Sequence, residues 1–171
     1  LDRARVLKQK LKKNIIIINT AEMLGGERFP LAINFSVNYN PKLMDIQEIV
    51  YEGEKFPYVQ FPQETPNMEM GEMLLEFINS YKPSYIVNVG GASLMLDVCS
   101  KAVPVLNVNT VPSNITYTHA TAQVVGNISE EKPEILLKII GKTKDSIIQG
   151  RFTSSLKPQR ENFSRKQLGY G

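Results

Sequence analysis

The clearest pattern in this chain is a set of short apolar runs, each followed by a turn and then by residues at helical spacing. Residues 15–18 form the strongest run, with four isoleucines in succession. Runs at 85–89 and 103–108 flank the segment 94–101, whose apolar positions are typical of a short buried helix. Because strands buried on both faces read as continuous β-branched runs, we expect parallel strands joined through a helix.

Further elements are predicted on both sides of the first apolar run. Residues 2–13 read as a helix and residues 46–51 as a strand, while the prolines of 56–62 favour an edge strand or a loop. Thr65 and Pro66 predict a helix start, as amino cap and first helical residue. The core face of that helix is expected to consist of Met70, Met73, Leu74, Phe77 and Ile78.

The last predicted elements are a strand over 117–125 and a helix over 133–149. Gly141 falls inside that helix and weakens it by about 1 kcal/mol relative to alanine, while Gly150 is a natural stop. We therefore predict an α/β domain over residues 1–150, a Rossmann-like three-layer αβα sandwich with a mostly parallel sheet. Residues 151–171 are basic and poor in aliphatic side chains, and we interpret them as a linker.

Composition and charge narrow the class of protein. The 171 residues are 42% hydrophobic, no apolar run approaches the ~20 residues of a membrane-spanning helix, and the amino-terminal run is too short for a signal peptide. A single cysteine excludes an internal disulfide and fits a reducing compartment, so we expect a cytoplasmic protein.

The charge is unevenly distributed along the chain. Residues 1–13 hold six Lys/Arg and one acid, and residues 151–171 hold five and one, whereas residues 14–150 carry a net charge of −6. The basic ends are either solvated helix and linker or a means of peripheral contact with the inner face of a membrane. The acidic body argues against a nucleic-acid partner, which would require a basic stripe.

Two glycine turns follow predicted strands and place a candidate ligand site. Parallel strands bind ligands beyond their carboxyl ends, so Gly25-Gly26 and Gly90-Gly91 are expected at that edge, with Ser93 and Asn109 beside them. The carboxylates of Glu22 and Glu27 flank the first turn and could meet substrate hydroxyls. The alternative interpretation is that the first turn is an ordinary one.

Few side chains suit catalysis. The chain has no phosphate loop, GxGxxG, CxxC, HExxH or GxSxG motif. A conventional zinc site is disfavoured, because the chain has only one histidine and one cysteine. Cys99 falls on an apolar helix face and reads as a structural thiol rather than half of a Cys–His pair. His119 is the candidate catalytic base or hydroxyl ligand, the alternative being a partly exposed strand histidine.

Three segments together resemble the amino-terminal half of a GT-B-fold glycosyltransferase of the family 4/1 type. They read IIIINTAEMLGGERFP, KPSYIVNVGGASLMLDVCSKAVPVLNVNT and FSRKQLGYG. In that family a glycine-rich loop follows the first strand, and a strand like KPDxVHxHG precedes a helix over the active-site cleft. Residues 165–169 look like the segment that enters the second, sugar-nucleotide-binding domain. Asn88 and Gly90 stand where the family often has histidine.

The resemblance implies a function that this chain would perform only with a second domain. It would bind a sugar acceptor, the nucleotide-sugar donor being a co-substrate held mainly by the second domain, with no metal or further cofactor. Gly25, Gly26, Glu27, Gly90, Gly91, Ser93 and Asn109 would bind substrate, and His119 would be catalytic. The alternatives are a non-catalytic α/β module that binds a partner or regulates an enzyme, and a dinucleotide-binding domain, which the absence of GxGxxG disfavours.

Overall fold

The computed structural model of this protein describes residues 1–22, 39–63, 67–90, 93–109, 115, 118–126 and 133–150. Strands and helices alternate along much of the described chain, which confirms the predicted α/β class. In order, the elements are α1 (Asp2–Leu11), β1 (Ile17–Asn19), η1 (Pro41–Leu43), β2 (Glu48–Tyr51), β3 (Glu54–Gln60), α2 (Met68–Tyr81), β4 (Ile86–Gly90), α3 (Leu94–Cys99), β5 (Val105–Asn109), β6 (Ala122–Val125), α4 (Pro133–Ile139), η2 (Lys144–Ser146) and β7 (Ile147–Gln149).

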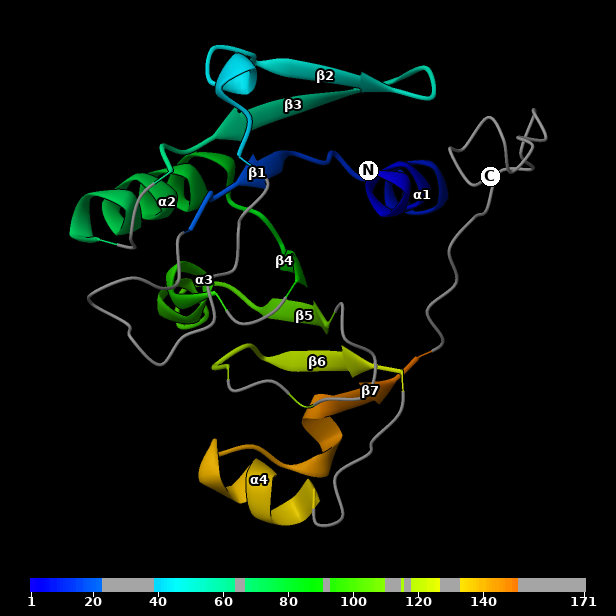
Figure 1. Ribbon diagram of the computed structural model, residues 1–171. Helices are drawn as coiled ribbons and strands as arrows, with labels where there is room; N and C mark the ends of the chain where they lie inside the picture. The colour runs from blue at the N-terminus through cyan, green and yellow to red at the C-terminus, as the bar shows by residue number, and fades with distance from the viewer. Residues whose placement is uncertain are drawn as a thin grey trace, which may run out of the picture.

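A four-stranded, all-parallel sheet forms the second half of the molecule, in the order β4-β5-β6-β7. Its first two strands are the apolar runs that the sequence pattern identified, and α3 connects them as predicted. Helices flank this sheet, an arrangement compatible with a Rossmann-like three-layer fold (Figure 1). In the same view the strands follow one another in the order β2, β3, β1, β4, β5, β6, β7.

A smaller mixed sheet, in the order β1-β3-β2, contains the first apolar run. β3 runs parallel to β1 and antiparallel to β2, so it is central, and the prediction of an edge strand or loop is wrong. Pro57 is tolerated because it lies one residue before Tyr58, the first residue that pairs with β1. The Tyr58 N–H donates to the Gln47 carbonyl at 2.9 Å, so the nitrogen of the preceding proline points away from β2.

The predicted helix over 133–149 is also wrong in its second half. α4 ends at Ile139, where Gly141 takes a φ of +67°. Lys142 N donates to Leu137 O at 2.8 Å and Gly141 N to Lys138 O at 3.1 Å, a pair of bonds typical of a glycine-terminated helix. The β-branched pair Ile147-Ile148 then forms β7 instead of a helical stripe.

The start of α2 differs from its prediction as well. The amino cap is Asn67, whose side-chain oxygen accepts from the Met70 N–H at 2.9 Å. An asparagine at this position satisfies a helix N–H that would otherwise have no partner. Thr65 and Pro66 lie outside the described residues, as does the predicted linker over 151–171.

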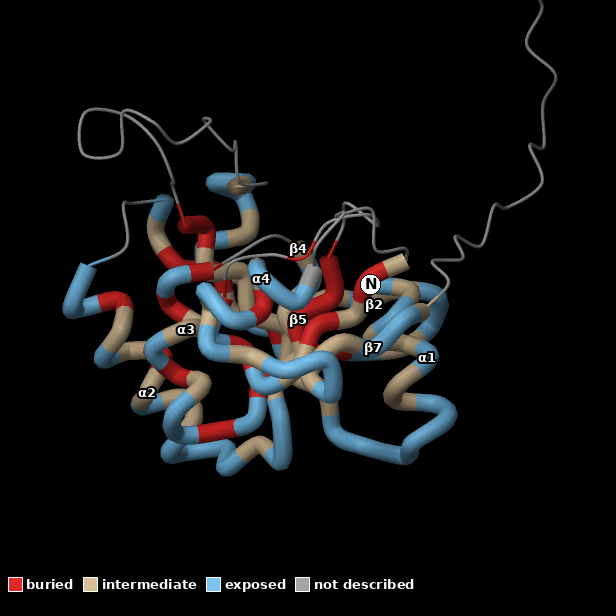
Figure 2. The backbone as a smooth tube through the Cα atoms, turned by 90° about the horizontal axis from the view of Figure 1, so that it is seen from below, coloured by how far each residue is buried: buried red, intermediate tan, exposed pale blue. Residues whose placement is uncertain are grey.

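An apolar cluster joins the mixed sheet to α2 and α3. Its buried members are Phe61, Met70, Leu74, Met95 and Cys99. Ile18 of β1 and Val59 of β3 pack against it, so the predicted core face of α2 contacts both the mixed sheet and α3. Figure 2 shows the buried stretches gathered in the interior of the molecule. Within the described ranges, none of the helices has the length and apolar character needed to cross a bilayer.

Candidate functional site

The loop after β1 and the start of α3 meet through the Glu22 carboxylate. One carboxylate oxygen accepts from the Ser93 hydroxyl, and the other accepts from the Leu94 N–H at 3.1 Å. Ser93 is also the amino cap of α3, since its Oγ accepts from the Leu96 N–H at 3.1 Å. These bonds fix the residues after the carboxyl ends of β1 and β4 against each other.

Burial dominates the electrostatics of Glu22. Only 5% of this residue is exposed, and the loss of solvent raises the pKa of its carboxyl group above the ordinary value. The hydrogen bonds from Ser93, Leu94 and Thr20 act in the opposite direction because they favour the charged form. The site therefore contains a desolvated carboxylate whose charge is stabilised by local donors.

The ends of β4 and β5 complete this edge of the sheet, because Gly90 pairs with Asn109 in the strand register. Gly90 has a φ of +155°, and a Cβ atom added to it would meet none of the described residues within 4 Å. Among the residues that the structure describes, the space before the backbone at the end of β4 is therefore open. We call the set Glu22, Gly90, Ser93 and Asn109 the carboxyl rim.

Behind the carboxyl rim, side-chain amides link β4, β5 and β6. Asn88 donates to Asn107, Asn107 donates to Asn109, and Asn109 donates to Gln123 at 3.4 Å. Asn107, Asn109 and Gln123 are each at most 2% exposed. We call these four residues the amide ladder. Because buried amides need partners, the ladder holds Asn109 in place instead of leaving it mobile at the rim.

Three residues of the carboxyl rim position its backbone and have little surface with which to contact a ligand directly. Glu22, Ser93 and Asn109 are 5%, 9% and 2% exposed, so their side chains support the rim from within. Gly90 is half-buried and Leu94, at the start of α3, is 43% exposed. A bound molecule would therefore meet mainly the backbone at Gly90 and the first residues of α3.

His119 lies apart from the carboxyl rim. The sequence placed it in a strand near the ligand edge, but β6 begins only at Ala122, and Thr121 bonds to the amide of Val105 at the start of β5. The His119 N–H donates to Asp97 at 2.8 Å, and its carbonyl accepts from Lys142 Nζ at 3.2 Å. Its placement near the carboxyl ends is thus corrected: the residue sits on the amino-terminal side of β6.

The structure brings together three of the predicted site residues, Gly90, Ser93 and Asn109, and their role in substrate binding stays a prediction. Gly25, Gly26, Glu27 and Gly91 lie outside the described residues. Cys99 is buried in the apolar cluster, as the helix pattern indicated. Burial raises the pKa of its thiol, and the charge of Glu22 raises it further, which keeps the thiol protonated.

Other polar residues of this region were not identified from the sequence. Asn88, Asn107 and Gln123 each interrupt an apolar strand, and a polar side chain in a run typical of a buried strand signals a buried hydrogen-bond network. Asp97 of α3 is half-buried and accepts from the hydroxyl of Thr118 and the N–H of His119.

Across the described part of the chain, no group of three His, Cys, Asp or Glu side chains is arranged to hold a metal ion. Comparisons with models of known protein families, with curated proteins and with solved structures found no significant match to this chain.

Proposed function

We propose that this chain is the acceptor-binding, amino-terminal domain of a GT-B-fold glycosyltransferase. In this proposal a second domain holds the nucleotide-sugar donor, and the chain described here binds and orients the sugar acceptor. It is inactive in transfer without that second domain. The parallel sheet supports the proposal, because open α/β sheets bind ligands beyond the carboxyl ends of their strands.

The observation that carries the proposal is that no described residue fills the space before the Gly90 backbone, at an edge that buried hydrogen bonds hold in place. A sugar ring can approach the backbone of a glycine because the residue has no side chain of its own. Glu22 and Ser93 are positioning residues, since they fix the start of α3 beside this space. Preorganised sites of this kind lose less entropy when a ligand binds.

The charge around the carboxyl rim favours a neutral ligand. The carboxylate of Glu22 lies behind the start of α3 and would repel a phosphate, and residues 14–150 carry a net charge of −6. Neutral hydroxyl groups can donate to backbone carbonyls and accept from backbone N–H groups without paying the cost of burying a charge. This chemistry matches a glycan acceptor better than a nucleotide sugar.

Two glycine substitutions test the proposal as a matched pair. Gly90→Ala places a methyl group in the open space, and Gly53→Ala does the same in the hairpin between β2 and β3, where Gly53 has a φ of +80° and equally open surroundings. Both variants carry backbone strain of about 1–3 kcal/mol. The probes are neutral gluco-, galacto-, manno- and N-acetylglucosamine oligosaccharides of one to four units, with nucleotide sugars as a second series.

We expect nuclear magnetic resonance titrations to show oligosaccharide-dependent shifts of the Gly90, Ser93 and Leu94 amide signals. Gly90→Ala should weaken binding by about tenfold or more, whereas Gly53→Ala should leave it unchanged. If no saccharide shifts these signals, or if both variants weaken binding equally, the proposal is wrong.

A second candidate function, a non-catalytic partner-binding module, is favoured by one feature of the parallel sheet. Val89, Val108, Val124 and Ile148 form a continuous apolar row across its four strands, and its two ends are 53% and 47% exposed. Between the two ends the row is covered, since Val108 is 8% exposed, but exposed apolar side chains such as those at its ends occur at protein interfaces. This function predicts that neither saccharides nor nucleotide sugars shift any amide signal, while the double variant Val89→Ser, Ile148→Ser loses binding to a protein partner.

A further inference from the structure

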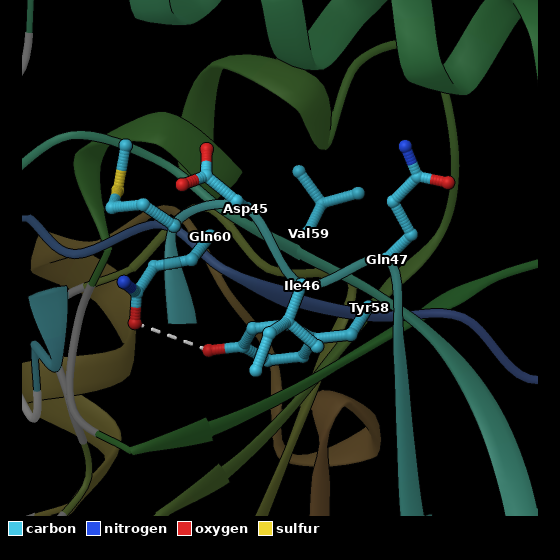
Figure 3. A pocket seen from close by; sticks show the side chains of 7 residues that line it. Asp45, Ile46, Gln47, Tyr58, Val59 and Gln60 are labelled. Atoms are coloured by element: carbon cyan, nitrogen blue, oxygen red, sulfur yellow. Dashed lines mark hydrogen bonds between the residues drawn. The ribbon is translucent and has the colours of Figure 1, made fainter. Parts of the chain in front are cut away.

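An open pocket of about 390 Å³ lies between the segment 44–47 and the end of β3. The two segments are neighbours because β2 is antiparallel to β3, so the residues before β2 lie beside the last residues of β3. Figure 3 shows the side chains of Asp45, Val59 and Gln47 on one side of the backbone, with the hydrogen-bonded pair Tyr58 and Gln60 on the other side.

The pocket opens at the same end of the sheet as the carboxyl rim. Gln60 is the last residue of β3 and pairs with Asn19, the last residue of the parallel strand β1. Asn19 Nδ2 donates to Gln60 Oε1 at 3.1 Å, and Glu22 of the rim follows three residues after Asn19. Since neighbouring strands lie about 4.8 Å apart, the pocket begins about one strand from the loop that carries Glu22.

Hydrogen bonds fix the inner wall of the pocket before any ligand binds. Gln60 is 5% exposed, its Oε1 accepts from the Tyr58 hydroxyl at 3.1 Å, and its Nε2 donates to the Asn40 carbonyl at 2.8 Å. In a second bond between these two residues, the Asn40 N–H donates to Gln60 Oε1 at 3.4 Å. A preformed wall is typical of small-molecule sites.

The side chains that line the pocket suit a neutral polyhydroxyl compound. Asp45 and Gln47 are exposed, so their oxygen and nitrogen atoms can contact hydroxyl groups directly. Met44 and Ile46 offer apolar surface for the C–H face of a sugar ring. Asp45 is the single charged residue among those lining the pocket, and its charge disfavours phosphate and carboxylate ligands.

We propose that this pocket is a second saccharide subsite, so that the acceptor contains at least two neutral sugar units. One unit lies before Gly90 at the carboxyl rim, and a further unit of the same saccharide reaches the pocket beside β3, across the end of β1. The inference rests on the proposed function, because the pocket sets the length of the acceptor only if a sugar unit is also bound at the carboxyl rim. The pocket supplies direct side-chain contacts, which the buried residues of the rim do not.

The test compares Asp45→Asn and Gln47→Ala with the control Asp145→Asn, which changes an exposed aspartate in η2. The probes are the neutral oligosaccharides of one to four units used above, and the readout is the amide signals of Ile46, Gln47 and Val59 beside those of Gly90, Ser93 and Leu94. We expect the longer saccharides, which can span the end of β1, to shift both sets, and single sugars to shift only the second set. The two pocket variants should weaken binding of the longer saccharides by about 2- to 10-fold and leave single sugars unaffected.

Failure of the subsite is distinguishable from failure of the proposed function. Shifts confined to the Gly90, Ser93 and Leu94 signals at every saccharide length would overturn the subsite and leave the proposed function in place. Absence of all shifts would overturn both. Equal weakening by Asp45→Asn and Asp145→Asn would show a general charge effect and would also overturn the subsite.

Discussion

Two buried regions hold this molecule together by opposite chemistry. The apolar cluster between α2 and α3 contains Phe61, Met70, Leu74, Met95 and Cys99, and it joins the mixed sheet to α3. The amide ladder crosses β4, β5 and β6 through Asn88, Asn107, Asn109 and Gln123. The first region gains stability in proportion to the apolar area removed from water, whereas the second depends on every amide finding a partner.

The two regions differ in how precisely they fix the strands that carry the candidate site. Apolar contacts tolerate small shifts, but a hydrogen-bonded amide row permits one strand register, because a slip of one residue would turn the amides to the other face. The ladder includes Asn109, which pairs with Gly90, so the more specific of the two regions supports the carboxyl rim. Stability and positional accuracy are thus supplied by different parts of the fold.

The largest expected effect is in the apolar cluster. Leu74 is 2% exposed, and Leu74→Ala should lower the free energy of unfolding by about 3 kcal/mol because it removes buried apolar surface and leaves a cavity. Leu74→Met, which conserves volume, should cost less than about 1.5 kcal/mol. Chemical denaturation measures both, and equal losses for the two variants would show that packing at this position does not decide stability.

The amide ladder should respond in a different way. Asn107→Leu leaves buried groups of Asn88 and Asn109 with fewer partners and should cost about 2 kcal/mol. Adding Asn109→Leu should cost less than the sum of the two single substitutions, because the second change removes a group that the first had already deprived of a hydrogen bond. Strict additivity in denaturation measurements would contradict the ladder as a coupled unit.

Glu22, whose carboxylate is hydrogen-bonded to the start of α3, gives an effect on stability that depends on pH. Its folded-state pKa is raised, so protonation favours the folded state, and its contribution to stability falls as the pH rises through that pKa. The stability difference between wild type and Glu22→Gln should therefore shift in favour of wild type on acidification toward pH 4.5, by at most about 1.4 kcal/mol per pH unit. A difference that does not vary with pH would contradict the burial of an ionisable group here.

The smallest expected effect lies outside both regions. Gly141→Ala forces a side chain into a φ of +67° at the end of α4 and should cost about 1 kcal/mol. Lys138→Ala, on the exposed side of the same helix, is the control and should change little. Thermal unfolding measures both variants. An equal loss of stability in Lys138→Ala and Gly141→Ala would contradict the claim that Gly141 terminates α4.

Local patterns predicted much of the fold and little of the site. Continuous β-branched runs identified β1, β4 and β5, and periodic methionine and leucine identified the core face of α2. The pattern did not separate α4 from β7, because Ile147-Ile148 fits a helical stripe and a strand equally well. The central position of β3 depends on pairing between distant segments, which no local pattern contains.

The carboxyl rim was partly predictable for a physical reason. Glycine and small polar residues after buried strands mark the ligand edge of a parallel sheet, and this placed Gly90, Ser93 and Asn109. The bond from Ser93 to Glu22 joins residues 71 positions apart, and the pocket beside β3 joins two segments that meet only after folding. Such contacts depend on tertiary structure, so sequence spacing gives no signal of them.

The central claim is that the open space at Gly90 and the pocket at Asp45 and Gln47 bind one neutral oligosaccharide. The most direct measurement is a crystal structure of the chain with the longest saccharide that binds in titration. We predict density for one sugar unit against the Gly90 backbone and for a further unit of the same saccharide toward Asp45 and Gln47. Well-ordered saccharide bound only elsewhere, for example against α1 or the β2–β3 hairpin, would contradict the account.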